Sequence, residues 1–220
     1  MNIRESIQKL LQEIPSGVRV VAVSKTKPDS LIREAYNAGQ RLFGENRTRE
    51  ITEKYPALPH DIEWHYIGHL QTNKVKQIAP FIGMIQSVDS LHLLTEIDKE
   101  AGKNGRVIPC LLQFHIASEE TKSGLNRGEA ESLLSSATYG SLRNIHIAGV
   151  MGMATFTDDT GLVRKEFKNL YGIYSYFKSA FFNADPGFCE VSMGMSGDYR
   201  IAIEEGSTMI RIGTAIFGER

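Results

Sequence analysis

Short apolar runs alternate with amphipathic stretches along the whole chain, and this alternation limits the possible folds more than any other feature. Eight such runs begin near residues 18, 41, 62, 84, 107, 145, 188 and 208. They are rich in β-branched residues and nearly continuous in apolar character, which is typical of parallel strands buried on both faces. Stretches with helical periodicity separate them, for example residues 91–101, 127–137 and 160–182.

Eight strand–helix units predict an α/β fold, a closed (β/α)8 barrel of the TIM type. An extra N-terminal helix precedes the first strand, because apolar residues fall on one helical face at Ile3, Ile7, Leu10, Leu11 and Ile14. The 220 residues suffice for one such barrel, so we predict a single domain over residues 1–220. An open doubly wound sheet remains an alternative, but no glycine fingerprint for a dinucleotide follows the first strand.

Charge and cysteine content narrow the class of protein. The net charge of -1 does not favour nucleic-acid binding, and no apolar run approaches the ~20 residues of a membrane span. Residues 1–14 mix charged and apolar side chains, so we expect no signal peptide. Cys110 and Cys189 have no partner at ligand spacing, which argues against a zinc site and a disulfide scaffold. We expect a cytoplasmic protein with no metal and no nucleic-acid or membrane partner.

Lys25 directly follows the first apolar run, where a barrel carries its reactive groups. Partial burial at a strand end favours the neutral amine, the form that attacks a carbonyl carbon. A solvated surface lysine is the ordinary alternative, and Lys27 is a second lysine in the same segment.

Polar residues also follow the second and third runs. Asn46 and Asn73 stand where either could line a site or cap a helix. His65 and His69 could share a strand face, which suggests a metal site, but no carboxylate cluster completes it. After the fifth run, the polar segment 116–124 is long enough to cover the end of a barrel.

The last two strands predict an anion site. Residues 192–198 read Ser-Met-Gly-Met-Ser-Gly-Asp before a helix, and the eighth run carries Arg211 before Gly213 and Thr214. Loops after strands seven and eight are the usual phosphate site of this fold. Ser196 as a simple helix cap is the alternative. A lysine opposite a phosphate site suits pyridoxal 5′-phosphate (PLP), or a phosphorylated sugar held as a Schiff base.

Six motifs occur in order from the first strand to the C-terminus: Val-Ser-Lys-Thr-Lys-Pro, Phe-Gly-Glu-Asn, Trp-His-Tyr-Ile-Gly-His-Leu-Gln-Thr-Asn-Lys, Lys-Ser-Gly, Ser-Met-Gly-Met-Ser and Arg-Ile-Gly-Thr-Ala-Ile-Phe-Gly. With them the chain resembles the YggS/PROSC family, the pyridoxal phosphate homeostasis proteins. The resemblance implies a fold like the N-terminal barrel domain of alanine racemase, with PLP as a Schiff base on Lys25. It also implies that the phosphate is held in the region of Ser192, Ser196, Gly213 and Thr214. Arg211 would face the pyridine nitrogen, and Asn46 and Met151 would line the ring pocket.

The resemblance further implies a role in PLP buffering and delivery, with effects on amino-acid and keto-acid balance and no established turnover. Apo forms of PLP enzymes are the expected partners, and we expect a monomer or a weak dimer. A weakly active amino-acid racemase or lyase is the alternative.

Arg211 argues against transamination, because an arginine does not protonate the pyridine nitrogen as a carboxylic acid does. Racemisation needs an acid or base on each face of the ring. Only Glu219 and Arg220 follow Gly218, so we expect no second domain to supply the other group.

Overall fold

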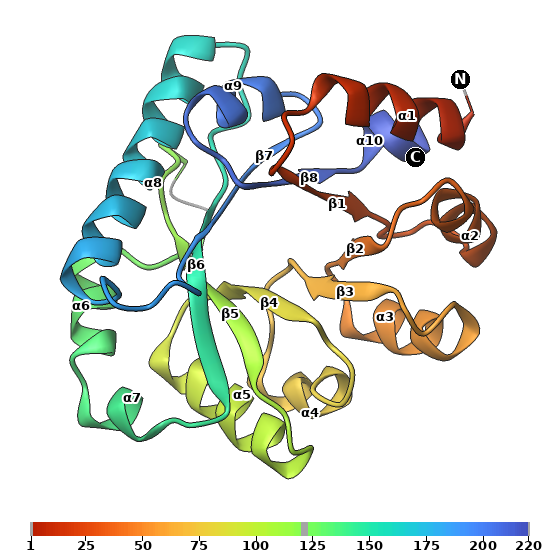
Figure 1. Cartoon of the computed structure of the whole chain (residues 1–220). Coiled ribbons are helices and arrows are strands. Elements are labelled where there is room, and N and C mark those ends of the chain that lie inside the picture. The colour runs from red at the N-terminus through yellow and green to blue at the C-terminus, as the bar shows by residue number, and fades with distance from the viewer. Residues whose placement is uncertain (1, 120–122, 220) are drawn as a thin grey trace.

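The strands of the computed structural model, which describes residues 2–119 and 123–219, close into a parallel barrel. They are β1 (Arg19–Val23), β2 (Leu42–Glu45), β3 (Glu63–Tyr66), β4 (Met84–Val88), β5 (Ile108–Phe114), β6 (Ile145–Gly152), β7 (Glu190–Met195) and β8 (Met209–Ile212). Each strand pairs with the next along the chain, and β8 pairs with β1, with Val21 opposite Arg211 (Figure 1). The predicted eight-stranded barrel is confirmed, and the open sheet is wrong.

Helices surround the barrel (Figure 1). They are α1 (Ile3–Glu13), α2 (Asp29–Asn37), α3 (Thr48–Lys54), α4 (Val75–Ile78), α5 (Leu91–Lys103), α6 (Arg127–Leu134), α7 (Ala137–Ser141), α8 (Thr160–Ala180), α9 (Tyr199–Glu204) and α10 (Thr214–Phe217), with the short 3-10 helices η1 (Tyr55–Ala57) and η2 (Thr72–Lys74). The predicted extra helix is α1, which contacts α2 and α10 and so brings both ends of the described chain together. The four helices α1, α5, α6 and α8 begin with side-chain caps from Asn2, Ser90, Asn126 and Asp159.

One predicted helix is divided in two. The periodicity predicts a continuous helix over 127–137, but α6 ends at Leu134 and α7 begins at Ala137. The hydroxyl of Ser136 accepts a hydrogen bond from the backbone N–H of Tyr139 at 3.1 Å. A serine that caps a new helix competes with continuation of the old one, which explains the break.

The barrel interior holds side chains of two kinds. Strand residues alternate between the interior and the layer under the helices, so Val20 packs outward and Val21 inward. The apolar interior residues are Val21, Leu42, Met84, Leu111, Ala148, Met151 and Met209. Polar side chains are buried in the same interior, at His65, Gln86, Ser192 and Arg211. Because a filled barrel leaves no channel, a ligand must bind at the mouth, the end where the strands finish.

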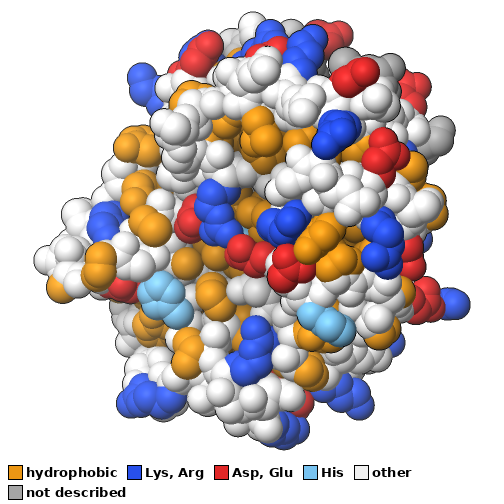
Figure 2. Space-filling model, turned by 45° about the vertical axis from the view of Figure 1, so that its right-hand side comes forward, with side chains coloured by type: hydrophobic (Ala, Val, Ile, Leu, Met, Phe, Trp, Pro, Cys, Tyr) orange, Lys and Arg blue, Asp and Glu red, His pale blue; other side chains and the backbone are white. Residues whose placement is uncertain are grey.

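The outer surface is mixed in charge. Figure 2 shows acidic and basic side chains interspersed on one face, with hydrophobic side chains in small groups between them. None of the helices in the described ranges has the length and apolar character needed to cross a membrane. Of the segment expected to cover the mouth, residues 120–122 lie outside the described part.

Candidate functional site

Lys25 stands at the mouth of the barrel, two residues beyond the end of β1. It is partly buried. Its amine forms no hydrogen bond or ion pair with any residue that the structure describes. The next residue, Thr26, has a positive φ of 63°, which is unusual for a residue with a branched side chain. The lysine therefore sits on a tight turn that something must hold in place.

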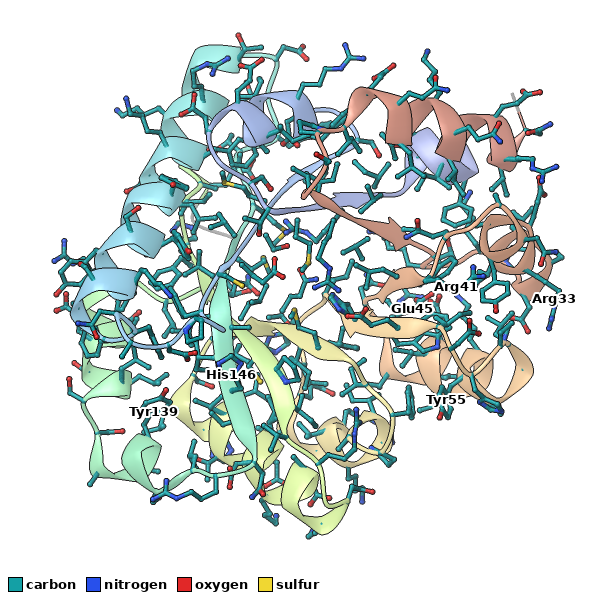
Figure 3. The ribbon with its side chains drawn as sticks, in the orientation of Figure 1. Arg33, Arg41, Glu45, Tyr55, Tyr139 and His146 are labelled. Carbon is teal, nitrogen blue, oxygen red and sulfur yellow. The ribbon has the colours of Figure 1, made fainter. Side chains whose placement is uncertain are left out.

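Hydrogen bonds from side chains hold this turn on both sides of the lysine. Ser24 donates its hydroxyl proton to Glu45 Oε1 at 2.6 Å, and Lys54 Nζ donates to the Ser24 carbonyl at 2.9 Å and to Glu45 Oε1 at 2.7 Å. On the other side, Glu50 Oε2 accepts the backbone N–H of Thr26 at 2.7 Å. Figure 3 labels Glu45 at the end of β2. Burial raises the pKa of the Glu45 carboxyl, and the positive charge of Lys54 opposes that rise.

The second lysine of the segment has another role. Lys27 Nζ donates hydrogen bonds to the carbonyls of Phe217, Gly218 and Glu219, at 3.2, 3.2 and 3.1 Å. It therefore ties the first strand–helix connection to the end of α10. Its ammonium group is occupied there, unlike the amine of Lys25.

Asn46 lies beside the Lys25 turn and keeps an unused polar atom. Its Oδ1 is buried and finds no hydrogen-bond partner in the described ranges. It does not cap α3, which begins after Arg47 without a side-chain cap. The backbone carbonyl of Asn46 accepts the Tyr66 hydroxyl proton at 3.1 Å. Gly68 packs so closely that a Cβ there would lie 2.5 Å from the Asn46 carbonyl oxygen. The neighbouring strands therefore fix Asn46 with one acceptor left free for a ligand.

Ser196 joins the loops after β7 and β8. Its Oγ accepts the backbone N–H groups of Gly213 at 3.2 Å and Ala215 at 3.4 Å. Asp198 does not cap α9; its Oδ1 accepts the backbone N–H of Met195 instead, at 2.5 Å. The structure thus brings Ser196, Gly213 and the exposed Thr214 together at the mouth, with backbone donors beside them.

Ser192 does not join that group, contrary to expectation. It is fully buried in the interior, where Arg211 Nη1 donates to its Oγ at 2.6 Å. Arg211 Nη2 donates to the carbonyl of Gly152 at 3.0 Å. Burial lowers the pKa of Arg211 to about 10, so the guanidinium still carries its charge at neutral pH. The structure therefore places Ser192 against Arg211, apart from Ser196 and Thr214 at the mouth.

Met151 is also deeper than a pocket-lining residue would be. It is completely buried among the apolar interior side chains, and the partly buried Met153 packs against that cluster. Met153 directly follows β6, so it lies nearer the mouth than Met151 does. Sequence reasoning misses it because two methionines flank Gly152 and only the barrel geometry separates them.

The two histidines do not form a metal site. His65 is enclosed in the interior, whereas His69 is exposed and its Nδ1 lies 3.4 Å from Asp89 Oδ2. Within residues 2–119 and 123–219, no group of three or more His, Cys, Asp or Glu residues is placed to hold a metal ion. A surface hollow of about 850 Å³ is lined by Asp89, by the start of α5 and by residues before and along α6, and neither Lys25 nor Arg211 is among its lining residues.

The mouth therefore combines three chemical features. Lys25 offers an unbonded amine, Arg211 a buried guanidinium beneath the mouth, and the loops after β7 and β8 a set of hydroxyl and backbone donors. Because β8 pairs with β1, the Gly213 loop lies next to the lysine turn, and a Cβ on Gly213 would lie 3.5 Å from Val23 Cβ. The set fits an aldehyde that carries a phosphate and a ring acceptor.

Comparison with known proteins gives a consistent result. The family model described as the alanine racemase N-terminal domain matches residues 1–220. A pyridoxal phosphate homeostasis protein of Aquifex aeolicus is 40% identical over 221 residues, covering 98% of this chain and 94% of that protein. PipY of Synechococcus elongatus, solved with PLP bound, is 34% identical with a TM-score of 0.87, covering 99% of this chain and 100% of PipY. An alanine racemase of Clostridium difficile, 15% identical with a TM-score of 0.78, shares the fold; the match covers 100% of this chain and 56% of the racemase.

Proposed function

Because this chain belongs to the family of the pyridoxal phosphate homeostasis proteins, we propose that it binds PLP at the barrel mouth and serves cellular PLP homeostasis. The observation that carries the proposal is the unbonded amine of Lys25 on a turn held by Ser24, Glu45 and Glu50. A relative that is 34% identical over nearly the whole chain was solved with PLP bound, which supports the same ligand here.

In this proposal each residue of the mouth binds a different part of PLP. The Lys25 amine forms a C=N bond to the PLP aldehyde carbon, and the aldehyde oxygen leaves as water. The loops carrying Ser196, Gly213 and Thr214 hold the phosphate with hydroxyl and N–H donors. Arg211 has only donors, so it faces the ring nitrogen in its unprotonated state. Asn46 Oδ1 is the free acceptor beside the ring, and Met153 provides an apolar contact.

We propose that the protein holds and releases PLP without fast turnover. Bound PLP supplies an electrophilic carbon and, when its ring nitrogen is protonated, an electron sink for a carbanion. Arg211 keeps that nitrogen unprotonated and so weakens the sink. The relatives that cover this chain are named as homeostasis proteins. A slow racemase is the alternative, and conversion of an L-amino acid to its D-form with saturable kinetics would establish it.

The proposal extends to compartment and partners. Cys110 and Cys189 are free thiols, which suits a reducing cytoplasm. Apo forms of PLP enzymes would receive the cofactor, from a monomer or a weak dimer. A transfer assay, in which the loaded protein activates an apo-enzyme, tests this part separately.

The Lys25→Ala variant tests the site. Wild-type protein mixed with PLP should show a Schiff base absorbance band, and borohydride should fix PLP on the peptide that contains Lys25, as found by mass spectrometry. Lys25→Ala should lose both signals, because the other lysine of this turn, Lys27, has its ammonium group bound to the carbonyls at the end of α10. Lys27→Ala is the matched control and should keep both. A wild-type protein with no band at saturating PLP, or a band that persists in Lys25→Ala, contradicts the proposal.

A further inference from the structure

A continuous line of polar side chains runs through the barrel interior to Arg211, four of them buried and the last, Glu63, exposed, and PLP binding alone does not require it. From Arg211 Nη1 it passes to Ser192 Oγ at 2.6 Å, and from Ser192 Oγ to Gln86 Oε1 at 2.7 Å. Gln86 Nε2 lies 2.7 Å from His65 Nδ1, and His65 Nε2 lies 2.9 Å from Glu63 Oε1. We call these five residues the interior relay. Four strands contribute to it, namely β3, β4, β7 and β8.

The direction of these hydrogen bonds follows from the end at Arg211. A guanidinium can only donate, so Ser192 Oγ must accept from Arg211. The serine proton then goes to Gln86 Oε1, which turns the Gln86 amide nitrogen towards His65. His65 Nδ1 must accept, so a neutral His65 carries its proton on Nε2 and donates it to Glu63.

The end of the relay at Glu63 requires the same direction of hydrogen bonding. Glu63 only accepts, and Arg19 Nη2 donates to its Oε1 at 2.7 Å from the far side. If the Gln86 amide were turned round, His65 Nδ1 would have to donate, and His65 would need a second proton to satisfy Glu63. That would place a positive charge in an interior where His65 has no exposed surface. The two ends of the relay thus permit one arrangement of the hydrogens between them.

We propose that Ser192, Gln86 and His65 are positioning residues that fix the Arg211 guanidinium through this single directed line of hydrogen bonds, with His65 neutral and protonated on Nε2. The inference rests on the proposed function only in that Arg211 would face the ring nitrogen of bound PLP. With Nη1 held by Ser192 and Nη2 by Gly152, the guanidinium plane is fixed at two points. Its remaining N–H groups are then oriented before any ligand arrives.

The burial of His65 favours its neutral state over the charges that surround it. Glu63 faces it on β3, and Arg19 on β1 and Glu190 on β7 act on it from a greater distance. Both glutamates favour a charged imidazole, whereas Arg19 and burial oppose it, and burial is the largest effect. Arg19 also pairs with both glutamates, at 2.7 and 3.2 Å, which reduces their effect on His65. Gln86 presents an amide rather than a charge to Nδ1.

Nitrogen NMR of the PLP-free protein, labelled with ¹⁵N-histidine, tests the relay directly. His65 should show the neutral form with the proton on Nε2 at neutral pH, and the signal is assigned by its loss in His65→Gln. In Gln86→Glu a carboxylate oxygen faces Nδ1, so Nδ1 should become protonated. A proton on Nδ1 in the wild-type protein overturns the proposal, whatever the variants do. Gln113→Met changes another buried interior glutamine outside the relay and should leave the His65 signal in place.

PLP release gives the second measurement. Gln86→Met keeps the side-chain length but removes both hydrogen bonds, so Arg211 loses its support. The Schiff base band should still form on Lys25, and its decay after dilution into PLP-free buffer should be about tenfold faster than in wild-type protein. Gln113→Met should release PLP at the wild-type rate. Equal release rates for Gln86→Met and wild-type protein overturn the proposal.

The two proposals fail differently. If wild-type protein binds no PLP, the proposed function is wrong, while the NMR of the PLP-free protein still decides the hydrogen arrangement. If wild-type protein binds PLP but His65 carries its proton on Nδ1, the relay is wrong and the proposed function stands.

Discussion

At the scale of single residues, the position of Lys25 depends on side chains that are themselves buried. Lys54 has 9% of its side chain exposed and Glu45 none, and they meet at 2.7 Å beneath the Lys25 turn. Glu45 Oε2 has no partner of its own in the described residues. A buried carboxylate in this state depends on its one ammonium partner, so the pair is sensitive to loss of either member.

Lys54→Met tests that dependence. The variant leaves Glu45 buried without a counter-charge and should lower the free energy of unfolding by about 3–5 kcal/mol, measured by urea denaturation. Adding Glu45→Gln should recover part of the loss, because the uncompensated charge is then gone. Lys99→Met, which removes an exposed ion pair, should change the stability little. A Lys54→Met protein as stable as wild type would show that the pair does not hold the turn.

At the scale of elements, the loop after β7 depends on the close packing of β7 against α9. Gly194 has a positive φ of 96°, and a Cβ there would lie 2.6 Å from Ala202 Cβ and 3.0 Å from Tyr199 Cα. Only glycine combines a positive φ with the lack of a Cβ atom. This packing places Ser196 where it accepts hydrogen bonds from Gly213 and Ala215.

Gly194→Ala should therefore displace α9 and lower the free energy of unfolding by about 1–3 kcal/mol, measured by chemical denaturation. PLP should also bind more weakly, because the two loops separate. Gly197→Ala is the matched control, since a Cβ there would meet nothing within 4 Å and the φ of Gly197 is not positive. Equal stability of the two variants would contradict the packing argument.

At the scale of the whole molecule, the closed interior couples stability to pH through His65. Burial lowers the pKa of His65 below its ordinary value of 6.5, so the unfolded chain takes up this proton before the folded chain does. The stability that His65 contributes is therefore complete above pH 6.5 and is lost as the pH falls below it. Glu63 stays charged across this range, because the hydrogen bond with His65 and, to a smaller extent, the one with Arg19 lower its pKa to about 2.

Urea unfolding at a series of pH values measures this coupling. Below pH 6.5 the wild-type protein should lose up to about 1.4 kcal/mol per pH unit from this one group. His65→Gln, which has no proton to gain there, should show a shallower slope over the same range. The same slope in both proteins would mean that His65 does not titrate with unfolding.

Much of the fold and part of the site could be predicted from the sequence. The barrel followed from local patterns, because a strand buried on both faces has its own periodicity. Lys25, Ser196, Gly213 and Thr214 could be proposed because parallel strands all end at the same edge. The helix break at Ser136 could not, because a serine in a helical stretch is compatible with both outcomes.

By itself, then, the sequence determined the number and order of the strands, the family, and the end of the barrel where chemistry belongs. Only the tertiary structure decided which side chains meet inside. Ser192 and Gln86 are 106 residues apart in the chain. Whether each side chain points into the barrel or towards the helices depends on register shifts between strands, such as the one between Ser192 and Met195. A shift of one residue exchanges the inward and outward faces, and no local pattern records it. That is why the sequence predicts Ser192 at a phosphate, whereas the fold places it under Arg211.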